Sequence, residues 1–308
     1  MLPERVEHCV DAFMAACSQP EKRQRLIAFY GGSFTGIETK LFDRYLKTAS
    51  NLVKRGVVHG AKASTRPDMV SPEIVKKLKD AGFVELELGA QSMDDKVLFL
   101  SGRGHTSQNT IEASAHIKKS GLRLGLQIMP GLPGEDRKSF ASTVDMIASL
   151  QPDTGRIYPT VILAGTQLER MYDRGKYIPL KIEEALHRAL FAYINLVEKG
   201  CIILRMGLPP SDNLKVIAGP YHPSFGYLVH CLAFRCMIEH LQKKQSKKLL
   251  VWVHPRDVAE LIGYKRCNQI EHGFSYMVDG SLPRGCLATD TGAESTCLYL
   301  RDIIGSVL

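Results

Sequence analysis

The sequence predicts an α/β fold in which helices cover a parallel sheet, and three observations support this prediction. Short apolar runs alternate along the chain with segments whose apolar residues recur at helical spacing. Proline and glycine stand where these helical segments begin and end. Polar, glycine-rich stretches follow directly after the apolar runs. Strands that alternate with helices favour parallel pairing, and the spacing suits either an open doubly wound sheet or a (β/α) barrel.

The order of elements can be read from the apolar runs and the segments between them. We expect strands at 26–30, 57–58, 84–88, 122–128, 156–162 and 201–205. We expect helices at 6–16, 41–53, 74–78, 111–117, 140–150 and 183–197. Pro72 opens one helix in its first turn, and Gly56, Gly82 and Gly121 each close one.

The pattern changes in the last part of the chain. An amphipathic helix leads to the basic run 243–248, which we interpret as a solvated linker. Beyond it we expect strands at 249–253 and 276–278 and a short helix at 257–262. The predicted domains are therefore a main domain at 1–215, a helical extension with a basic linker at 216–248, and a small α/β region at 249–308.

Composition limits the classes of protein that the chain can represent. Its 308 residues are 44% hydrophobic and 23% charged, which is ordinary for a globular protein. No apolar run is long enough to span a bilayer, and the N-terminus lacks a signal-peptide pattern, so we expect a cytoplasmic protein without a membrane partner. The net charge of +8 permits nucleic-acid binding without establishing it.

The eight cysteines are scattered, and no Cys-x-x-Cys pair occurs. Cys231 and Cys236 are the most closely spaced, on a predicted helix. We interpret them as packing residues rather than as metal ligands, so no metal site is predicted from this chain's residues.

Polar residues and glycines follow five successive predicted strands. These stretches are Gly31-Gly32-Ser33-Phe34-Thr35-Gly36, Ser64-Thr65-Arg66-Pro67-Asp68, Glu87-Leu88-Gly89-Ala90-Gln91-Ser92, Gln127-Ile128-Met129-Pro130-Gly131-Leu132-Pro133-Gly134-Glu135 and Tyr158-Pro159-Thr160. In parallel α/β folds the carboxyl ends of the strands meet and build the site. A convergent ligand site therefore explains these stretches better than loop composition.

Several of these motifs, taken in order, resemble the radical S-adenosylmethionine family. They are Tyr30-Gly31-Gly32-Ser33-Phe34-Thr35, Ser64-Thr65-Arg66-Pro67-Asp68, Glu87-Leu88-Gly89-Ala90-Gln91-Ser92, Arg103-Gly104-His105-Thr106 and Met129-Pro130-Gly131-Leu132-Pro133-Gly134. The likeness spans residues 25–215 and is strongest to the branch that contains the catalytic subunit of Elongator and its bacterial relatives. It implies a partial (β/α)6 TIM-like barrel without its first strand, and the pattern of the last part of the chain adds a small C-terminal α/β region to it.

The resemblance also implies a cofactor, S-adenosylmethionine, bound across the strand ends. Gly31, Gly32 and Ser33, in a motif that ends at Thr35, would hold its methionine amino group. Ser64, Arg66, Gln91 and Arg103 would lie near the ribose and the carboxylate, and Gln127, Met129 and Pro130 would flank the adenine. An arginine fork suits a carboxylate, and an apolar strand end suits a purine. For His105, substrate binding and a packing role both stay open, and catalytic residues are not identified.

The family's second cofactor, a 4Fe–4S cluster, has no ligands in this sequence. The family binds it through a Cys-x3-Cys-x2-Cys loop, whereas Cys9 and Cys17 stand eight residues apart on or next to a predicted helix with no third cysteine nearby. The chain is either an N-terminally incomplete version of a normal enzyme or a relative without a cluster. We favour the first, because the residues of the cofactor motifs are intact.

Three functions are compatible with this interpretation. The first is the core of an enzyme that in complete form cleaves S-adenosylmethionine to a 5′-deoxyadenosyl radical and modifies a substrate, with transfer RNA as the candidate; this chain alone would not be competent. The second is a non-catalytic S-adenosylmethionine or RNA binding module. The third, a doubly wound nucleotide-binding enzyme, is the least favoured because Gly31-Gly32 lacks the Gly-x-Gly-x-x-Gly spacing.

Overall fold

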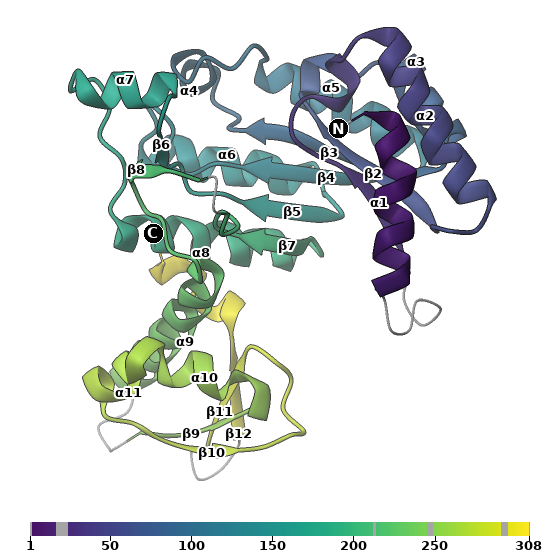
Figure 1. The fold of residues 1–308 in the computed structure, drawn as a ribbon. Helices are drawn as coiled ribbons and strands as arrows, with labels where there is room; N and C mark the ends of the chain where they lie inside the picture. The colour runs from purple at the N-terminus through teal and green to yellow at the C-terminus, as the bar shows by residue number, and fades with distance from the viewer. Residues whose placement is uncertain (1, 17–23, 212–213, 245–248, 291–294, 308) are drawn as a thin grey trace. The chain divides into compact units, whose positions relative to one another are not determined.

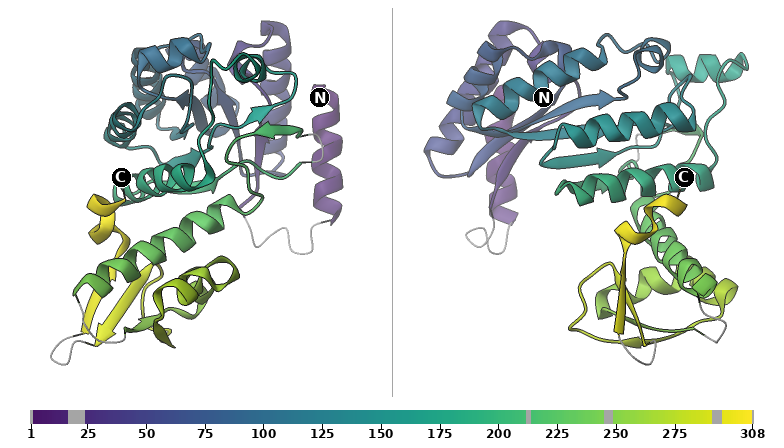
Figure 2. Two further views of the ribbon diagram at one scale, coloured as in Figure 1. Left: turned by 90° about the vertical axis from the view of Figure 1, so that its left-hand side faces the viewer. Right: turned by 180° about the vertical axis from the view of Figure 1, so that it is seen from behind.

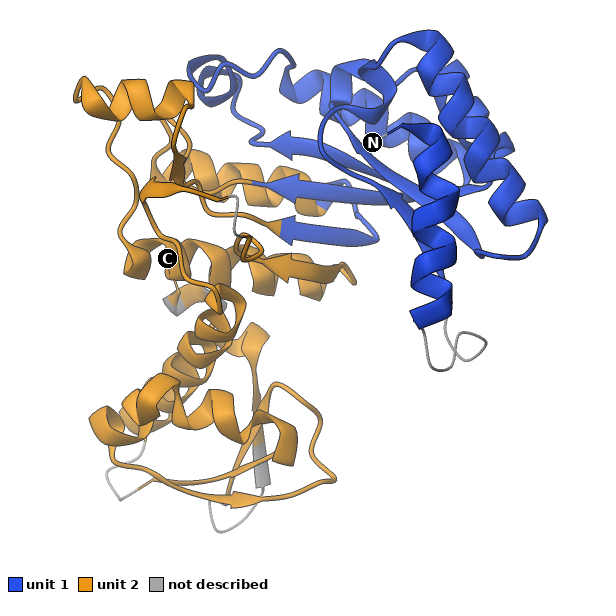
Figure 3. Ribbon diagram, in the orientation of Figure 1, with its two compact units in different colours: residues 1–128, 149–156 blue, residues 129–148, 157–308 orange. Residues whose placement is uncertain are grey.

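The computed structural model describes residues 2–16, 24–211, 214–244, 249–290 and 295–307 (Figure 1). The chain divides into two compact units (Figure 3). Unit 1 consists of residues 1–128 and 149–156, and unit 2 consists of residues 129–148 and 157–308. The division into 1–215, 216–248 and 249–308 stays a prediction.

Unit 1 is built from strands that alternate with helices. Its helices are α1 (Pro3–Ala16), α2 (Thr39–Lys54), α3 (Pro72–Asp80), α4 (Asp95–Leu100) and α5 (Ser107–Ser120), with short 3-10 turns at Phe34–Gly36 and Pro67–Met69. Its strands are β1 (Leu26–Phe29), β2 (Gly60–Thr65), β3 (Phe83–Gln91), β4 (Arg123–Ile128) and most of β5 (Thr154–Ile157). The predicted alternation of strand and helix is confirmed.

The main sheet has six strands in the order β1-β2-β3-β4-β5-β7, where β7 is Ile202–Met206. The pairs β1–β2, β2–β3 and β3–β4 are parallel. The strands follow one another in chain order, whereas a doubly wound sheet reverses its order at a switch point. The sheet is therefore the partial barrel of the predicted fold class, and the doubly wound alternative is wrong.

Helices α2, α3 and α5 contact strands β2, β3 and β4 from one face (Figure 2). Side chains alternate between the two faces of a strand. On β2, Ala61, Ala63 and Thr65 are buried under the helices. Lys62 and Ser64 therefore point to the opposite face, which is the inner face of the barrel.

The helix boundaries in unit 1 follow the predicted signals. Ser71 caps α3 by accepting a hydrogen bond from the amide of Ile74, and Pro72 occupies the first turn. Thr106 and Asn109 cap each other's backbone amides at the start of α5. Gly121 ends α5 at a φ of +80°, a conformation that favours glycine.

An aromatic cluster holds β1 and the turn after it against helix α2. The ring of Phe34 lies 4.8 Å from that of Phe29, 5.4 Å from Phe42, 5.8 Å from Tyr45 and 5.7 Å from Phe83. Phe34 is buried. Because Phe34 follows Gly31-Gly32-Ser33 directly, this cluster fixes the position of the glycine-containing turn.

Unit 2 contains the remaining elements. They are most of α6 (Arg137–Ser149), β6 (Ile162–Leu163), α7 (Gln167–Asp173), α8 (Ile182–Glu198), β7, β8 (Val216–Ala218), α9 (Phe225–Lys244), β9 (Leu250–Val253), α10 (Val258–Ile262), α11 (Cys267–His272), β10 (Ser275–Val278), β11 (Cys286–Asp290) and β12 (Ser295–Tyr299). A four-stranded sheet has the order β10-β9-β11-β12, in which only β9–β10 is parallel. Helix α9 contacts α8 and α10. The last part of the chain is thus a small α/β region, as predicted.

Two expected strands differ from those observed. Residues 57–58 lie in the turn after α2, and the strand begins at Gly60 instead. The run 156–162 contains the end of β5 and the first residue of β6, and the residues between them form no strand. Strands β11 and β12 were not predicted. Among the described residues, no helix is both long and apolar enough to cross a membrane.

Candidate functional site

A cluster of hydroxyl groups joins the ends of β1 and β2. The Ser33 hydroxyl lies 2.8 Å from the Thr65 hydroxyl, and the Thr35 hydroxyl lies 2.6 Å from it. Ser33 also accepts a hydrogen bond of 3.1 Å from the amide of Arg66. The structure therefore brings together three predicted site residues. It adds Thr65, which stands within a quoted motif but was not predicted as a site residue.

The two glycines after β1 leave open space beside the backbone. Gly31 has a φ of +114°, which strongly favours glycine. A Cβ atom placed on Gly31 or Gly32 would meet no atom within 4 Å. The protein itself thus does not require a glycine for packing here. The free space allows a ligand to approach the backbone carbonyl and amide groups.

Arg66 is held by a neighbouring carboxylate. Its Nε donates to Asp68 at 3.0 Å and its terminal nitrogen donates at 2.7 Å, so one edge of the guanidinium fork is engaged. This pairing raises the pKa of Arg66. A Cβ atom on Gly104 would collide with the guanidinium group, so Gly104 is required for this position of Arg66. Asp68 was missed as a site residue, although the motif around Arg66 contains it.

Arg103 and His105 extend the site from the loop between α4 and α5. Arg103 is partly buried, and burial followed by the nearby charge of Arg66 lowers its pKa. His105 is buried, with its Nε2 3.1 Å from the carbonyl oxygen of Ala90. Burial lowers the pKa of His105, so the ring is neutral and Nε2 donates to Ala90. Its Nδ1 is then an acceptor, buried without a hydrogen-bond partner among the described residues.

Gln91 and Gln127 meet at the ends of β3 and β4. The amide nitrogen of Gln127 donates to the side-chain oxygen of Gln91 at 3.0 Å. Gln91 adopts a φ of +67°, which is strained for a residue with a side chain. Its side chain folds over Gly89, where a Cβ atom would lie 2.5 Å from the Gln91 nitrogen. The strain at a strand end indicates a site that holds a polar amide in a defined position.

The inner face of the sheet is lined by charged residues instead of apolar ones. Arg156 lies 2.8 Å from Glu87, and its guanidinium stands over the ring of Tyr30 and donates to its hydroxyl. Burial raises the pKa of Glu87, while Arg156 and the hydroxyl of Ser64 oppose this shift. Barrel interiors are usually filled with branched apolar side chains. This polar face is therefore suited to a polar ligand.

A second charged layer lies one step deeper on the same face. Glu85 lies 3.8 Å from Lys62 and 3.6 Å from Arg123, and it accepts a hydrogen bond of 3.2 Å from Thr154. Glu85 is buried, so its charge is balanced by these neighbours. Sequence reasoning missed both layers, although Glu85 and Glu87 alternate within an otherwise apolar strand.

Met129 and Pro130, the last two predicted cofactor residues, follow β4 in the chain and belong to unit 2. The Pro130 carbonyl accepts a hydrogen bond of 2.9 Å from the amide of Thr160. The loop after them is fixed at Gly131, whose amide donates to Glu135 at 2.6 Å and whose carbonyl accepts from Tyr177 at 2.6 Å.

Glu135 and Arg188 form a buried ion pair of 2.7 Å beneath this loop in unit 2. Burial raises the pKa of Glu135 to about 7. The pair was missed in the sequence, where Glu135 reads as the end of a glycine- and proline-rich loop and Arg188 as one face of a helix.

The described residues do not fit a 4Fe–4S cluster. Within them, no group of three or more His, Cys, Asp or Glu side chains is placed to hold a metal ion. Cys231 and Cys236 are buried, and burial raises the pKa of both thiols, that of Cys236 to about 11. Thiols of this kind are poor metal ligands. Cys17 lies outside the described residues.

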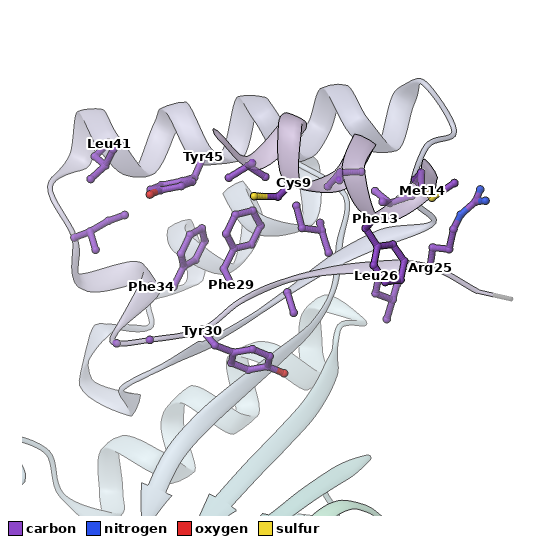
Figure 4. Close-up of a pocket in the computed structure, with 18 of the residues that line it drawn as sticks. Cys9, Phe13, Met14, Arg25, Leu26, Phe29, Tyr30, Phe34, Leu41 and Tyr45 are labelled. Atoms are coloured by element: carbon purple, nitrogen blue, oxygen red, sulfur yellow. The ribbon is translucent and has the colours of Figure 1, made fainter. Parts of the chain in front are cut away.

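A pocket of about 850 Å³ opens between α1 and β1 in unit 1 (Figure 4). Phe13 and Met14 from α1 and Leu26 and Phe29 from β1 line it, and it reaches Gly31 and Gly32. Phe13 is 66% exposed, so α1 presents an apolar side chain to the open pocket. Among the described strands, β1 pairs with β2 alone. The pocket therefore lies along the unpaired edge of the sheet.

Comparison with known proteins gives family matches that together cover residues 7–147 and 152–232. Residues 7–147 match the model of the radical SAM superfamily, and residues 152–232 match the model of the Radical_SAM C-terminal domain. A tRNA uridine(34) acetyltransferase from Methanocaldococcus infernus is 36% identical over 132 residues, which are 42% of this chain and 24% of that protein. Elongator complex protein 3 of Bos taurus is 30% identical over 38% of this chain and 22% of its own length. The chain thus spans about a quarter of the length of these relatives.

A solved structure shows the same fold. The archaeal Methanocaldococcus infernus Elp3 with an N-terminal deletion superposes with a TM-score of 0.57 at 22% identity, over 76% of this chain and 58% of that chain. The family matches and the order of the parallel strands indicate the same family, and the polar residues at the strand ends are consistent with it. This chain belongs to the radical SAM superfamily and is related to the Elongator Elp3 type of tRNA-modifying enzyme.

Proposed function

We propose that this chain is the S-adenosylmethionine-binding core of a radical enzyme that modifies transfer RNA. The observation that carries the proposal is the convergence of Ser33, Thr35, Arg66, Gln91 and Gln127 at the carboxyl ends of four neighbouring parallel strands. This edge is where α/β folds bind ligands. The polar groups have defined partners, so the site is preorganised.

Each part of the cofactor has a matching group. The carbonyl groups beside Gly31 and Gly32 and the hydroxyl of Ser33 would accept hydrogen bonds from the methionine amino group. Arg103, with Arg66 nearby, would bind the carboxylate as a charge-assisted donor. Ser64 and Gln91 would contact the ribose, and Gln127, Met129 and Pro130 would flank the adenine.

The substrate proposal has two supports. A relative described as a tRNA uridine(34) acetyltransferase is 36% identical to this chain over 132 aligned residues. This chain also carries a net charge of +8, which favours binding to a polyanion. Because the chain spans only a quarter of that relative, the proposal does not extend to acetyl transfer.

The cysteines that bind a cluster would have to come from a segment other than these 308 residues. We propose that this segment pairs with the edge of β1 opposite β2. A strand added in parallel to β1 would lie about 4.8 Å from it, within the pocket between α1 and β1. Its carboxyl end would then stand beside Gly31 and Gly32. No step of the reaction is assigned to the residues of this chain alone.

A second function is favoured by one specific observation, the lack of cluster ligands among the described residues. A chain with the cofactor site and no cluster would be a binding module for S-adenosylmethionine or RNA. The enzyme and the S-adenosylmethionine-binding form of the module both predict cofactor binding, and they differ in the product expected once a cysteine-bearing segment is added upstream. Formation of 5′-deoxyadenosine after that addition would support the enzyme. A confirmed cluster without this product would support the module.

The test common to both functions is calorimetric titration of the chain with S-adenosylmethionine. We expect saturable binding, and we expect Arg103→Gln to weaken it by about tenfold because one charge-assisted hydrogen bond is lost. Arg55→Gln is the matched control, since Arg55 is an exposed residue at the end of α2 and lies outside the site. Absence of binding by the unmodified chain would refute the S-adenosylmethionine-binding module, whereas the enzyme is tested by the formation of 5′-deoxyadenosine after the upstream segment is added.

A further inference from the structure

A second cavity, of about 660 Å³, lies wholly within unit 2 and is not used by the proposed cofactor site. It is lined by residues of helices α8 and α9, by Asp257 and Glu260 at and within α10, by the loop before β11 and by the end of β12. Small-molecule pockets typically have volumes of about 300–1,000 Å³. The aromatic and charged side chains that line the cavity include Tyr193, His230, Glu260, Arg284, Tyr299 and Arg301.

The cavity is flanked by aromatic rings. Tyr193 and His230 meet edge to face, with their centroids 5.1 Å apart. Tyr299 also lines the cavity, and the guanidinium carbon of Arg301 lies 4.8 Å from the centroid of its ring. Burial, followed by the charge of Arg284, lowers the pKa of His230, so the imidazole is neutral at pH 7. Rings of this kind stack with any flat base.

Two arginines line the cavity, and a neighbouring carboxylate holds one of them more closely than the other. Asp257, which is buried, accepts a 2.7 Å hydrogen bond from the Nε of Arg284 and another of 2.7 Å from the amide of Gly285. This arrangement fixes the Arg284 side chain, which is 58% exposed, and leaves its terminal nitrogens available. Arg301 is 64% exposed, and its nearest carboxylate, that of Asp302, is 3.9 Å away.

A carboxylate oxygen provides the third feature. The Oε2 atom of Glu260 is buried and has no hydrogen-bond partner among the described residues. A buried acceptor of this kind is stabilised when a ligand donates to it. A purely apolar or purely anionic ligand would leave Glu260 without a donor.

We propose that this cavity binds one nucleotide unit, with its base against Tyr193 and Tyr299, an amino or imino group on Glu260 and its phosphate on Arg284 and Arg301. A nucleotide combines the flat ring, the hydrogen-bond donor and the anion that these side chains select together. The unit comes either from a free nucleotide or from single-stranded RNA. In the second case the cavity gives the RNA substrate of the proposed function a second point of attachment, so this version rests on the proposed function.

The test uses the full chain and two kinds of probe. The four nucleoside 5′-monophosphates are titrated by calorimetry, and a labelled single-stranded RNA dodecamer is titrated by fluorescence anisotropy. Val197 lines the cavity and is 42% exposed, so Val197→Glu places a negative charge at the site with little effect on folding. Ile270→Glu is the matched control, because Ile270 is 74% exposed on α11 and does not line the cavity.

We expect saturable binding that Val197→Glu weakens by about tenfold or more and that Ile270→Glu changes less than about twofold. Arg301→Gln should weaken binding by about fivefold, with Arg256→Gln, an exposed residue outside the cavity, as its control. Binding of a monophosphate identifies a free nucleotide as a sufficient ligand, and binding of the dodecamer alone identifies RNA as the source.

Two results would overturn the proposal. One is that the unmodified chain binds neither a monophosphate nor the dodecamer. The other is that Val197→Glu and Ile270→Glu weaken binding equally, which would place the contact elsewhere on the chain. Titration with S-adenosylmethionine on the same samples separates this outcome from failure of the proposed function, since none of the proposed cofactor residues lines this cavity.

Discussion

Arg66 occupies its position because Gly104 leaves room for it. Gly104 has an ordinary backbone conformation, and the atom that a Cβ would meet is the mobile end of a side chain. We therefore predict that Gly104→Ala displaces Arg66 from Asp68 and weakens S-adenosylmethionine binding by about fivefold, while unfolding free energy changes by less than about 1 kcal/mol. Calorimetry and urea unfolding measure the two effects.

The control for this substitution is Gly280→Ala, where a Cβ would meet no atom within 4 Å and the backbone is also ordinary. It should change neither quantity. Equal affinities for Gly104→Ala and the unmodified chain would show that the placement of Arg66 does not matter to the cofactor.

Glu135 makes the stability of unit 2 depend on pH. Its pKa in the folded chain is about 7, whereas a glutamate in the unfolded chain has a pKa near 4.5. The folded state thus holds a proton that the unfolded state releases, so the stabilisation is fully present below pH 4.5 and is lost as pH rises through 7. Between pH 5 and pH 7.5 the loss should be about 2 kcal/mol.

Glu135→Gln serves as the reference, because glutamine still accepts a hydrogen bond from the Gly131 amide but does not titrate. The difference in thermal midpoint between the two chains, measured at intervals from pH 5 to pH 7.5, reports Glu135 alone. If the thermal midpoint of the unmodified chain instead rises relative to that of Glu135→Gln as pH increases, Arg188 keeps Glu135 ionised in the folded state.

At the scale of elements, the aromatic cluster around Phe34 sets the stability of the glycine-containing turn. Phe34 contacts rings from β1, α2 and β3, so its loss leaves a cavity that several rigid elements cannot fill. We predict that Phe34→Ala lowers the free energy of unfolding by about 3–5 kcal/mol. Phe99→Ala, at a position that is 81% exposed, should lower it by less than about 1 kcal/mol. Urea unfolding of both variants checks this, and similar losses would contradict the role of the cluster.

Strands β3 and β2 show which kind of strand can be predicted from apolar periodicity and which kind cannot. Strand β3 was found because Val84, Leu86 and Leu88 recur at every second position. Strand β2 (Gly60–Thr65) was displaced to the apolar pair 57–58, because its own residues are small or polar. Its outer face needs alanines to fit under the helices, and its inner face carries Lys62 and Ser64 for the polar interior. Apolar periodicity does not detect a strand whose inner face binds polar groups.

At the scale of the whole molecule, chain order and motif order were sufficient for the fold, whereas the site at the carboxyl edge of the sheet stays a proposal. The individual contacts were not predictable, because they depend on which side chain satisfies which neighbour in space. Arg156 reaches Glu87 and Tyr30 across more than one strand. Pairings of this kind have no signature in spacing along one chain.

The last prediction concerns the metal content of the entire chain. Its sequence has no Cys-x3-Cys-x2-Cys loop, and the described residues contain no cluster of metal-ligating side chains. We predict that strictly anaerobic reconstitution leaves fewer than about one iron per chain, with equally little acid-labile sulfide. About four irons with matching sulfide would contradict this prediction. In that case the double variant Cys231→Ser and Cys236→Ser is the decisive control: loss of the iron would assign the cluster to these two thiols, against the high pKa that burial gives them.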